Sequence, residues 1–482
     1  MRRPMSPRLA GLGLALASTL LTTGCAVGPT YRPPAALPGT ALKLREADVA
    51  SVTPSPLPPR WWRLFDDANL DRLVEKALAH NTDLRQSAAN LQRARAALSE
   101  AGAGRLPTSE ASAQAVHERI NPQSLGGGPV ATDFYAVGFD AGYEIDLFGG
   151  VTRSIQAARA DYQAAQAEVD AARVSVAAET ARAYVDACAF AAQAAVARQT
   201  ADLQANTLDL TERMYRGGRS SERDFAQAQV LFEQARAQVP SFEAERRAAL
   251  YALAVLTGDP PADVDSAAER CTTPPSTRKP IPVGDGQALL ARRPDVRAAE
   301  RKLAGDVARI GVATADLYPS ITLAGSVTLG AAKVGDLGRD RSLTYSAGPL
   351  ISWNIPFNGA ARARVRESRA TAQASLAAFD GTVLTALQET EQALARLQGA
   401  ADREDALTRA ATASERAAAL SDLRFRAGSD SFLQLLDAER DRANTRAALA
   451  QAQADRAAAQ ISLFKALGGG WEAAPDIVSP VF

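Results

Sequence analysis

The chain has 482 residues, a formal net charge of +0 and 22% charged residues, a balance that excludes the basic face that nucleic-acid binding needs. Only 6% of the residues are aromatic, so one large globular core would be poorly supplied with bulky side chains. The alanine-rich remainder favours long helices packed side by side, because alanine is the best helix former and lets backbones approach closely.

Residues 1–24 have the pattern of a targeting segment. A positive region precedes an apolar run, Leu9 to Leu21, which is too short to span a membrane as a helix. The run leads to Gly-Cys, which resembles a bacterial lipoprotein box in which Cys25 becomes the lipid-bearing first residue of the mature chain. Thr22 stands where such a box usually has leucine, and Ala26 rather than aspartate follows, which favours the outer membrane. The alternative is an ordinary secretory signal with an incidental cysteine.

Residues 25–60 are rich in proline and predict an extended tether rather than a domain. Two further cysteines remain, Cys188 in helical sequence and Cys271 in a proline-rich connector. They could form a disulfide in an oxidising compartment. Their spacing indicates neither a disulfide framework nor a metal site, so the sequence leaves their pairing open.

Helical sequence begins near Asp66 and continues to Gly104, with a joint expected near Asn81. The strands come next: one is expected at about 134–146, and its residues alternate strictly between the two faces from Tyr135 to Asp146. One face carries Tyr135, Val137, Phe139, Ala141, Tyr143 and Ile145, and the other carries Ala136, Gly138, Asp140, Gly142, Glu144 and Asp146.

Three further strands are expected, at about 110–119, 320–330 and 343–356, and the first of these has the weakest pattern. Each of the four segments has about 9 to 12 residues, the length that crosses a bilayer when a strand is tilted. A soluble sandwich would show the same alternation. Four strands beside hundreds of helical residues are too few to build one.

The helices that follow the strands are long. Nothing breaks the helical pattern from Gly150 to about Tyr215, a stretch on the order of 95 Å long, and the stretch from Gly359 to about Phe425 matches it. Each ends in Arg-x-Gly, where glycine tolerates the positive φ of a helix stop. Shorter helices are expected at about 82–104, 221–256, 285–317 and 431–467.

The same motifs recur about 210 residues apart. Arg426 falls on Arg216, Gly428 on Gly218 and Ser431 on Ser221 when the two long helices are aligned. We therefore predict tandem repeats. The expected organisation is a signal peptide (1–24), a lipidated tether (25–60), repeat 1 (61–270), a connector (271–284), repeat 2 (285–470) and a C-terminal tail (471–482).

The predicted fold is mainly α with a membrane β part: a long helical barrel and four transmembrane strands per chain. Four strands alone would leave unpaired backbone groups in hydrocarbon, so other copies of the chain must close the sheet. Two copies would give eight strands, whose interior is filled by side chains, and three would give twelve. The pattern excludes a monomeric barrel more firmly than it selects a trimer.

At this point the chain resembles the TolC/NodT family of outer-membrane efflux factors, in its lipoprotein branch. The resemblance rests on the segments 62–67, 144–149, 292–296, 318–321, 425–440 and 463–471, which occur in the family's order. It implies a homotrimer with one twelve-stranded barrel and a hollow helical cylinder that extends into the periplasm. It also implies docking on a periplasmic adaptor and on an inner-membrane transporter, expected to be of the RND type, with no cofactor.

The resemblance also implies candidate functional residues. Leu433 and Asp437 lie four residues apart, hence on one helix face, and related proteins use matching positions to close the inner aperture. The alternative is that Asp437 pairs with Arg440 or Arg424 on a solvated helix.

Two further sets of residues are candidates. The turns at the helical tips, with Arg216, Gly218, Arg426 and Gly428, are expected to contact the adaptor, although any helix stop would look the same. Lumen carboxylates at Asp140, Glu144 and Asp146 predict a mild cation preference.

An enzyme is disfavoured, because neither histidine, His80 or His117, lies near a paired carboxylate or cysteine, and we expect no catalytic or metal site. The other alternative is a lipidated periplasmic coiled-coil adaptor or scaffold, which has no need of a lipid-facing aromatic band. The sequence does not reveal the exported substrate.

Overall fold

The computed structural model describes residues 26–34, 44–47, 51–120, 130–355 and 359–477, so Cys25 lies outside the described residues. The chain divides into two compact units. Unit 1 consists of Met1–Pro34, Gln92–Ala164 and Ala299–Phe379, and unit 2 of Ala35–Leu91, Ala165–Ala298 and Asp380–Phe482. Each unit therefore takes segments from both halves of the sequence.

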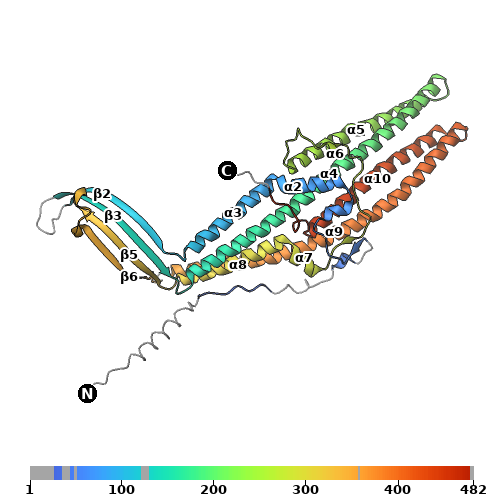
Figure 1. The fold of residues 1–482 in the computed structure, drawn as a ribbon. Coiled ribbons are helices and arrows are strands. Elements are labelled where there is room, and N and C mark those ends of the chain that lie inside the picture. Colours follow the sequence, from blue (N-terminus) through green and yellow to red (C-terminus); the bar gives the residue numbers. More distant parts are fainter. Residues whose placement is uncertain (1–25, 35–43, 48–50, 121–129, 356–358, 478–482) are drawn as a thin grey trace, which may run out of the picture. The chain divides into compact units, whose positions relative to one another are not determined.

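Unit 1 contains a four-stranded antiparallel sheet with the strand order β2-β3-β5-β6 (Figure 1). The strands are β2 (Thr108–Ile120), β3 (Val130–Ile145), β5 (Ser320–Ala331) and β6 (Leu343–Ser352). Phe139 lies opposite Val327, and Tyr143 opposite Leu323, so apolar side chains of neighbouring strands share one face of the sheet. The expected alternation and the four strands are thus confirmed, including β2, whose sequence pattern was the weakest.

Six helices form three pairs of equal length. The pairs are α3 (Thr82–Ala103) and α8 (Pro294–Ala315) with 22 residues each, α4 (Gly150–Arg216) and α9 (Ala360–Arg426) with 67, and α5 (Glu222–Leu256) and α10 (Phe432–Ala466) with 35. In unit 2, α5 folds back along α4 and α10 along α9 (Figure 1). An ion pair between Arg198 and Glu243 joins α4 to α5. An ion pair of 2.8 Å between Arg403 and Asp455 joins α9 to α10.

The segment predicted as one helix at 285–317 is two helices, so this expectation was wrong in one respect. A short helix, α7 (Gly286–Arg292), ends before α8 begins at Pro294. Proline disfavours helical geometry in the residue that precedes it, and Arg293 is accordingly extended with φ −62° and ψ 119°. The first half has the corresponding joint at Asn81, between α2 (Ala68–His80) and α3.

The hydrophobic core of unit 2 forms where short elements pack on the middle of the long helices. Trp61 and Trp62, from the short 3₁₀ helix η2 (Trp61–Phe65), are almost fully buried, and Trp61 stacks on Phe464 of α10 with ring centroids 4.6 Å apart. The core also takes in a two-stranded parallel sheet of β1 (Val52–Thr53) and β4 (Ile281–Pro282). None of the described helices combines the length and the apolar composition that a membrane-spanning helix requires.

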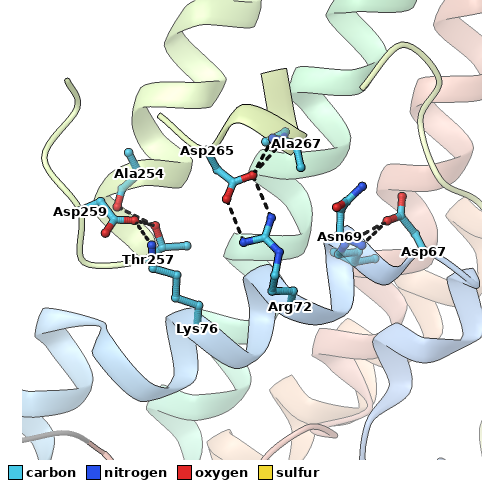
Figure 2. A network of polar contacts seen from close by, with 11 residues as sticks. Asp67, Asn69, Arg72, Lys76, Ala254, Thr257, Asp259, Asp265 and Ala267 are labelled. Carbon is cyan, nitrogen blue, oxygen red and sulfur yellow. Dashed lines mark hydrogen bonds and ion pairs between the residues drawn. The ribbon is translucent and has the colours of Figure 1, made fainter. Parts of the chain in front are cut away.

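Polar contacts hold the segment after α5 against α2 (Figure 2). Arg72 of α2 pairs with Asp265 at 2.8 Å, and Asp265 also accepts from the backbone of α6 (Ser266–Glu269). Lys76 forms an ion pair with Asp259, whose carboxylate also accepts from the Thr257 hydroxyl. The segment 257–269, which leads into the connector, is therefore fixed to α2 by charge-assisted hydrogen bonds.

A disulfide also fixes this connector. Cys188, which is fully buried on α4, is bonded to Cys271, which follows α6, and their Cα atoms are 5.1 Å apart. The sequence left this pairing open. The bond joins residues 83 positions apart and encloses the first helical hairpin, and the second hairpin has no such bond in its described part.

Candidate functional site

The sheet of unit 1 has one apolar and one polar face, and both are open to solvent in the isolated chain. On the apolar face the exposed fractions are 53% for Phe139, 52% for Leu323 and 66% for Ile351. Side chains of this size are rarely exposed as a contiguous group unless they meet a membrane or a partner. The polar face carries Glu110 opposite Asp140, and Ser326 opposite Ser346 with hydroxyl oxygens 2.7 Å apart.

The three predicted lumen carboxylates have different surroundings. Asp140 and Glu144 are exposed on the polar face of β3. Asp146 lies beyond the end of β3 and is half-buried, because its carboxylate accepts from the backbone N–H groups of Val151 (3.0 Å) and Thr152 (2.8 Å). Asp146 therefore caps the N-terminus of α4, where a negative charge is favourable. The sequence did not reveal this second role.

Both helical tips are tight turns closed by glycine. Gly218 (φ +70°) and Gly428 (φ +75°) have the left-handed geometry that glycine adopts without strain. The Arg219 N–H donates to the Met214 carbonyl at 2.8 Å, and the Ser429 N–H to the Arg424 carbonyl at 2.9 Å, which satisfies carbonyls at the helix ends.

The helix after each tip begins with a capping box. Ser221 and Asp224 form the box of α5, and Ser431 and Gln434 form that of α10. The Ser221 hydroxyl and backbone N–H donate to Asp224 and lower the pKa of its carboxyl. The two tips therefore share the same turn geometry and the same kind of helix cap.

The tip arginines point outward from these turns. The side chains of Arg216 and Arg426 are 74% and 72% exposed, and each pairs with an acidic residue one turn earlier, Glu212 and Asp422 respectively. Nothing lies within 4 Å of a Cβ placed on Gly218 or Gly428. The tips are thus accessible to a partner.

The candidate gate residues lie on the exposed face of α10. Leu433 is 57% exposed, and the Asp437 side chain is 56% exposed and pairs with Arg440 at 3.2 Å. This pair is one that the sequence offered as the alternative to a gate. Arg424 pairs instead with Asp430 at 2.7 Å. Leu436, by contrast, is 1% exposed and packs inward.

Two turns above the tip, α10 carries a buried charged cluster that the sequence analysis missed. Glu439 is 9% exposed and pairs with Arg442, and Arg446 pairs with Glu415 of α9. Burial raises the pKa of the Glu439 carboxyl, which Arg442 partly offsets. The only signal was an acid and a base at i and i+3, a spacing that is common on solvated helices.

The first described residues of the chain lie at the junction of the sheet and the helices of unit 1. The Val27 N–H donates to the Phe148 carbonyl at 3.0 Å, and Arg153 of α4 donates to the carbonyls of Val27 (3.1 Å) and Gly28 (3.2 Å). A Cβ on Gly28 would lie 2.6 Å from the backbone of Gly311. The residues that follow Cys25 are therefore held at the turn between β3 and α4.

Comparisons with known proteins agree with this arrangement of sheet and helices. A family model described as outer membrane efflux protein matches residues 73–259 and 286–469. Nodulation protein T of Rhizobium leguminosarum bv. viciae is 32% identical over 464 residues, which cover 96% of this chain and 94% of that protein.

Two further matches extend over nearly the whole chain. Outer membrane protein OprJ of Pseudomonas aeruginosa is 32% identical over 492 residues, which cover 99% of this chain and 98% of that protein. The solved structure of the outer-membrane channel OprN superposes with a TM-score of 0.87 at 34% identity, covering 93% of this chain and 100% of that one.

Proposed function

The chain belongs to the outer membrane efflux protein family, and we propose that three copies of it form the exit duct of a tripartite efflux system. The observation that carries the proposal is the sheet, which has an apolar face, a polar face and two free edges, β2 and β6. Free edges cannot remain unpaired in hydrocarbon. Three copies of four strands give twelve, which is the smallest of the closures considered with a water-filled interior.

We infer that the duct conducts passively and catalyses nothing, since the matched relatives are channel proteins. Their names differ in cargo: OpmQ of Pseudomonas aeruginosa is a pyoverdine export protein, and TtgC of Pseudomonas putida a toluene efflux pump protein. The cargo of this chain would accordingly be chosen by its inner-membrane transporter, for which we propose the RND type.

We propose that the tip turns, with Arg216, Gly218, Arg426 and Gly428, contact the periplasmic adaptor. Their exposure supports this role, as does the hydrogen-bonded closure of each turn at a glycine. Rigid turns lose little conformational freedom on binding, which favours association.

We propose that Leu433 and Asp437 of three copies surround one axis and narrow the duct at its inner end. Both side chains are exposed on one face of α10, so they are available to line an aperture. Asp140 and Glu144 would line the barrel and favour cations, and Asp146 would contribute less because helix α4 already uses its charge.

We propose that Cys25 carries lipid. The support is the position of the next residues: Ala26 packs on Gly149, and the Val27 N–H donates to the Phe148 carbonyl, in the turn that joins the sheet to α4. A lipid on the preceding residue would lie beside the face that meets the membrane.

The experiment is reconstitution of the purified, detergent-extracted mature chain in planar bilayers. We expect a heat-sensitive oligomer that produces discrete conductance steps, and a reversal potential across a salt gradient of the sign for cation preference. A monomer without conductance would contradict the duct. Anion preference would contradict the lumen role of the carboxylates alone.

A further inference from the structure

Four arginines crowd the N-terminal end of α9, at positions 362, 364, 366 and 369. All four are exposed, and the first turn of the helix contains no acidic residue. Cations at a helix N-terminus are unfavourable, because the helix dipole is positive there. In the part of the chain that the structure describes, no ion pair involves Arg362, Arg366 or Arg369. The helix therefore tolerates positive charge without an internal partner.

Three of these arginines form one stripe along the helix. Arg362, Arg366 and Arg369 are spaced by four and three residues, which places them on one face, whereas Arg364 points away from them. Arg364 lines a cleft with Asp316, which directly follows α8, and with Asp161 of α4. The helix face between the stripe and Arg364 is buried, and it carries Ala361, Val365 and Ala372. The arginine stripe and the cleft thus lie on opposite faces of the layer formed by α4, α8 and α9.

The cleft between the helices opens on the same side of unit 1 as the polar face of the sheet. The arginine stripe therefore lies on the same side as the apolar face. Arg364 and Asp316 also line a second cavity with Glu144, Ser320 and Ser352, which lie on the polar face of the strands or continue it. The N-terminal segment of the chain packs, at Gly28, on Gly311 of α8. Gly311 lies on the side of α8 that faces away from the cleft. The stripe therefore shares its side with the apolar sheet face and with the segment that follows Cys25.

The stripe also lies at a specific depth along the apolar face. Aromatic residues end that face near the helices: Trp353 is 51% exposed and Tyr143 is 40% exposed. Such residues lie at the boundary between hydrocarbon and headgroups. Helix α9 begins eight residues after β6 ends at Ser352, so its first turns lie just past this boundary.

We propose that Arg362, Arg366 and Arg369 bind the phosphate groups of anionic phospholipids in the periplasmic leaflet of the outer membrane. Guanidinium groups bind phosphate through two parallel hydrogen bonds, and an anion at this position would offset the unfavourable helix dipole. This proposal rests on the proposed function in one respect: the barrel must place the apolar face of the sheet in lipid. It adds a lipid class that the arginine stripe recognises.

The test compares two variants of the full mature oligomer with the wild type. The first is the triple variant Arg362→Gln/Arg366→Gln/Arg369→Gln. The matched control is Arg364→Gln, which removes the neighbouring arginine on the opposite face. Each protein is extracted from vesicles of equimolar phosphatidylglycerol and phosphatidylcholine, and the retained lipids are measured by native mass spectrometry.

We expect the wild type and the control to retain phosphatidylglycerol preferentially, and the triple variant to lose preference by on the order of fivefold per arginine. Molar salt should weaken the preference of the wild type, whereas millimolar inorganic phosphate should not displace the lipid. An unchanged preference in the triple variant, an equal loss in the control, or a wild type without preference would each overturn the proposal. So would loss of adaptor binding by the triple variant with its lipid preference intact.

Conductance in pure phosphatidylcholine bilayers separates this proposal from the proposed duct. The triple variant should conduct there like the wild type, because the stripe lies outside the lumen. Conducting oligomers without lipid preference would refute the stripe and leave the duct standing.

Discussion

Acidic residues near the helical tips are held in different ways, and this decides which of them can act in gating. Asp224 is used in a capping box, and Glu439 is buried against Arg442. Asp437 is exposed, and among the described residues its one ion-pair partner is Arg440, one turn away on the same helix. An exposed pair of this kind contributes less than about 1 kcal/mol, so Asp437 can exchange Arg440 for a passing cation at little cost.

Replacing Leu433 and Asp437 together by alanine should widen the aperture. We expect a several-fold rise in single-channel conductance in planar bilayers, because both bulk and fixed charge are removed from the axis. The matched control is Arg223→Ala/Gln227→Ala, which changes the equivalent positions on α5. Unchanged conductance in well-assembled oligomers of the Leu433/Asp437 variant would remove these residues from the gate.

The Arg72–Asp265 contact should make the attachment of the segment after α5 to α2 sensitive to acid. A hydrogen bond from Arg72 lowers the pKa of the Asp265 carboxyl in the folded state. The contact therefore stabilises the fold above the ordinary aspartate value of about 3.9, and this contribution is lost as the pH falls through the lower folded value.

The variant Asp265→Asn tests this pH dependence. We expect it to be less stable than the wild type by about 1 kcal/mol or less at neutral pH, since the Arg72 side chain is half exposed. The difference in thermal midpoint should shrink below about pH 4. A difference of the same size at pH 7 and pH 3 would show that the carboxylate charge does not matter.

At the scale of elements, the disulfide should stabilise the first helical hairpin. A bond between residues 83 positions apart restricts the unfolded chain, and such bonds typically contribute about 2–4 kcal/mol. The variant Cys188→Ala/Cys271→Ala should therefore have a lower thermal midpoint than the wild type. A reductant should lower the wild type to the same value and leave the variant unchanged. If a reductant lowers the thermal midpoints of the wild type and the variant equally, the disulfide is not the cause of the change.

The elements differ in how much of them the sequence could predict. The strands and the long helices were predictable, because alternation and helical periodicity are local properties, and Gly218 and Gly428 mark the helix stops by themselves. The break in the predicted 285–317 helix was also predictable, because Pro294 disfavours helical geometry at Arg293. The pairing of Cys188 with Cys271 was not predictable, because only packing of the connector on α4 brings them together.

The candidate site shows the same division. The tip residues and the pair Leu433 and Asp437 could be named from motif and resemblance. The cap formed by Asp146 and the buried Glu439 could not, since each depends on which neighbours surround the carboxylate in three dimensions.

The equal helix pairs support our proposal that residues 61–270 and 285–470 are two copies of one ancestral repeat.

At the scale of the whole molecule, the central claim is that β2 of one copy pairs with β6 of the next. Within one chain these strands are three strand spacings apart, about 14 Å, so a bond between them must join two chains. Ala111, Ala113, Ala115 and Ala347 all lie on the apolar face, whereas Gln114 lies on the polar face.

The most direct measurement is disulfide cross-linking in membranes between a cysteine at Ala347 and one at Ala111, Ala113 or Ala115. The account predicts that at least one of these three double variants yields covalent dimers and trimers under mild oxidation. The control with cysteines at Gln114 and Ala347 should yield none, because its two side chains lie on opposite faces. Absence of cross-linked species from all three double variants in folded, membrane-inserted protein would contradict a barrel closed by neighbouring copies.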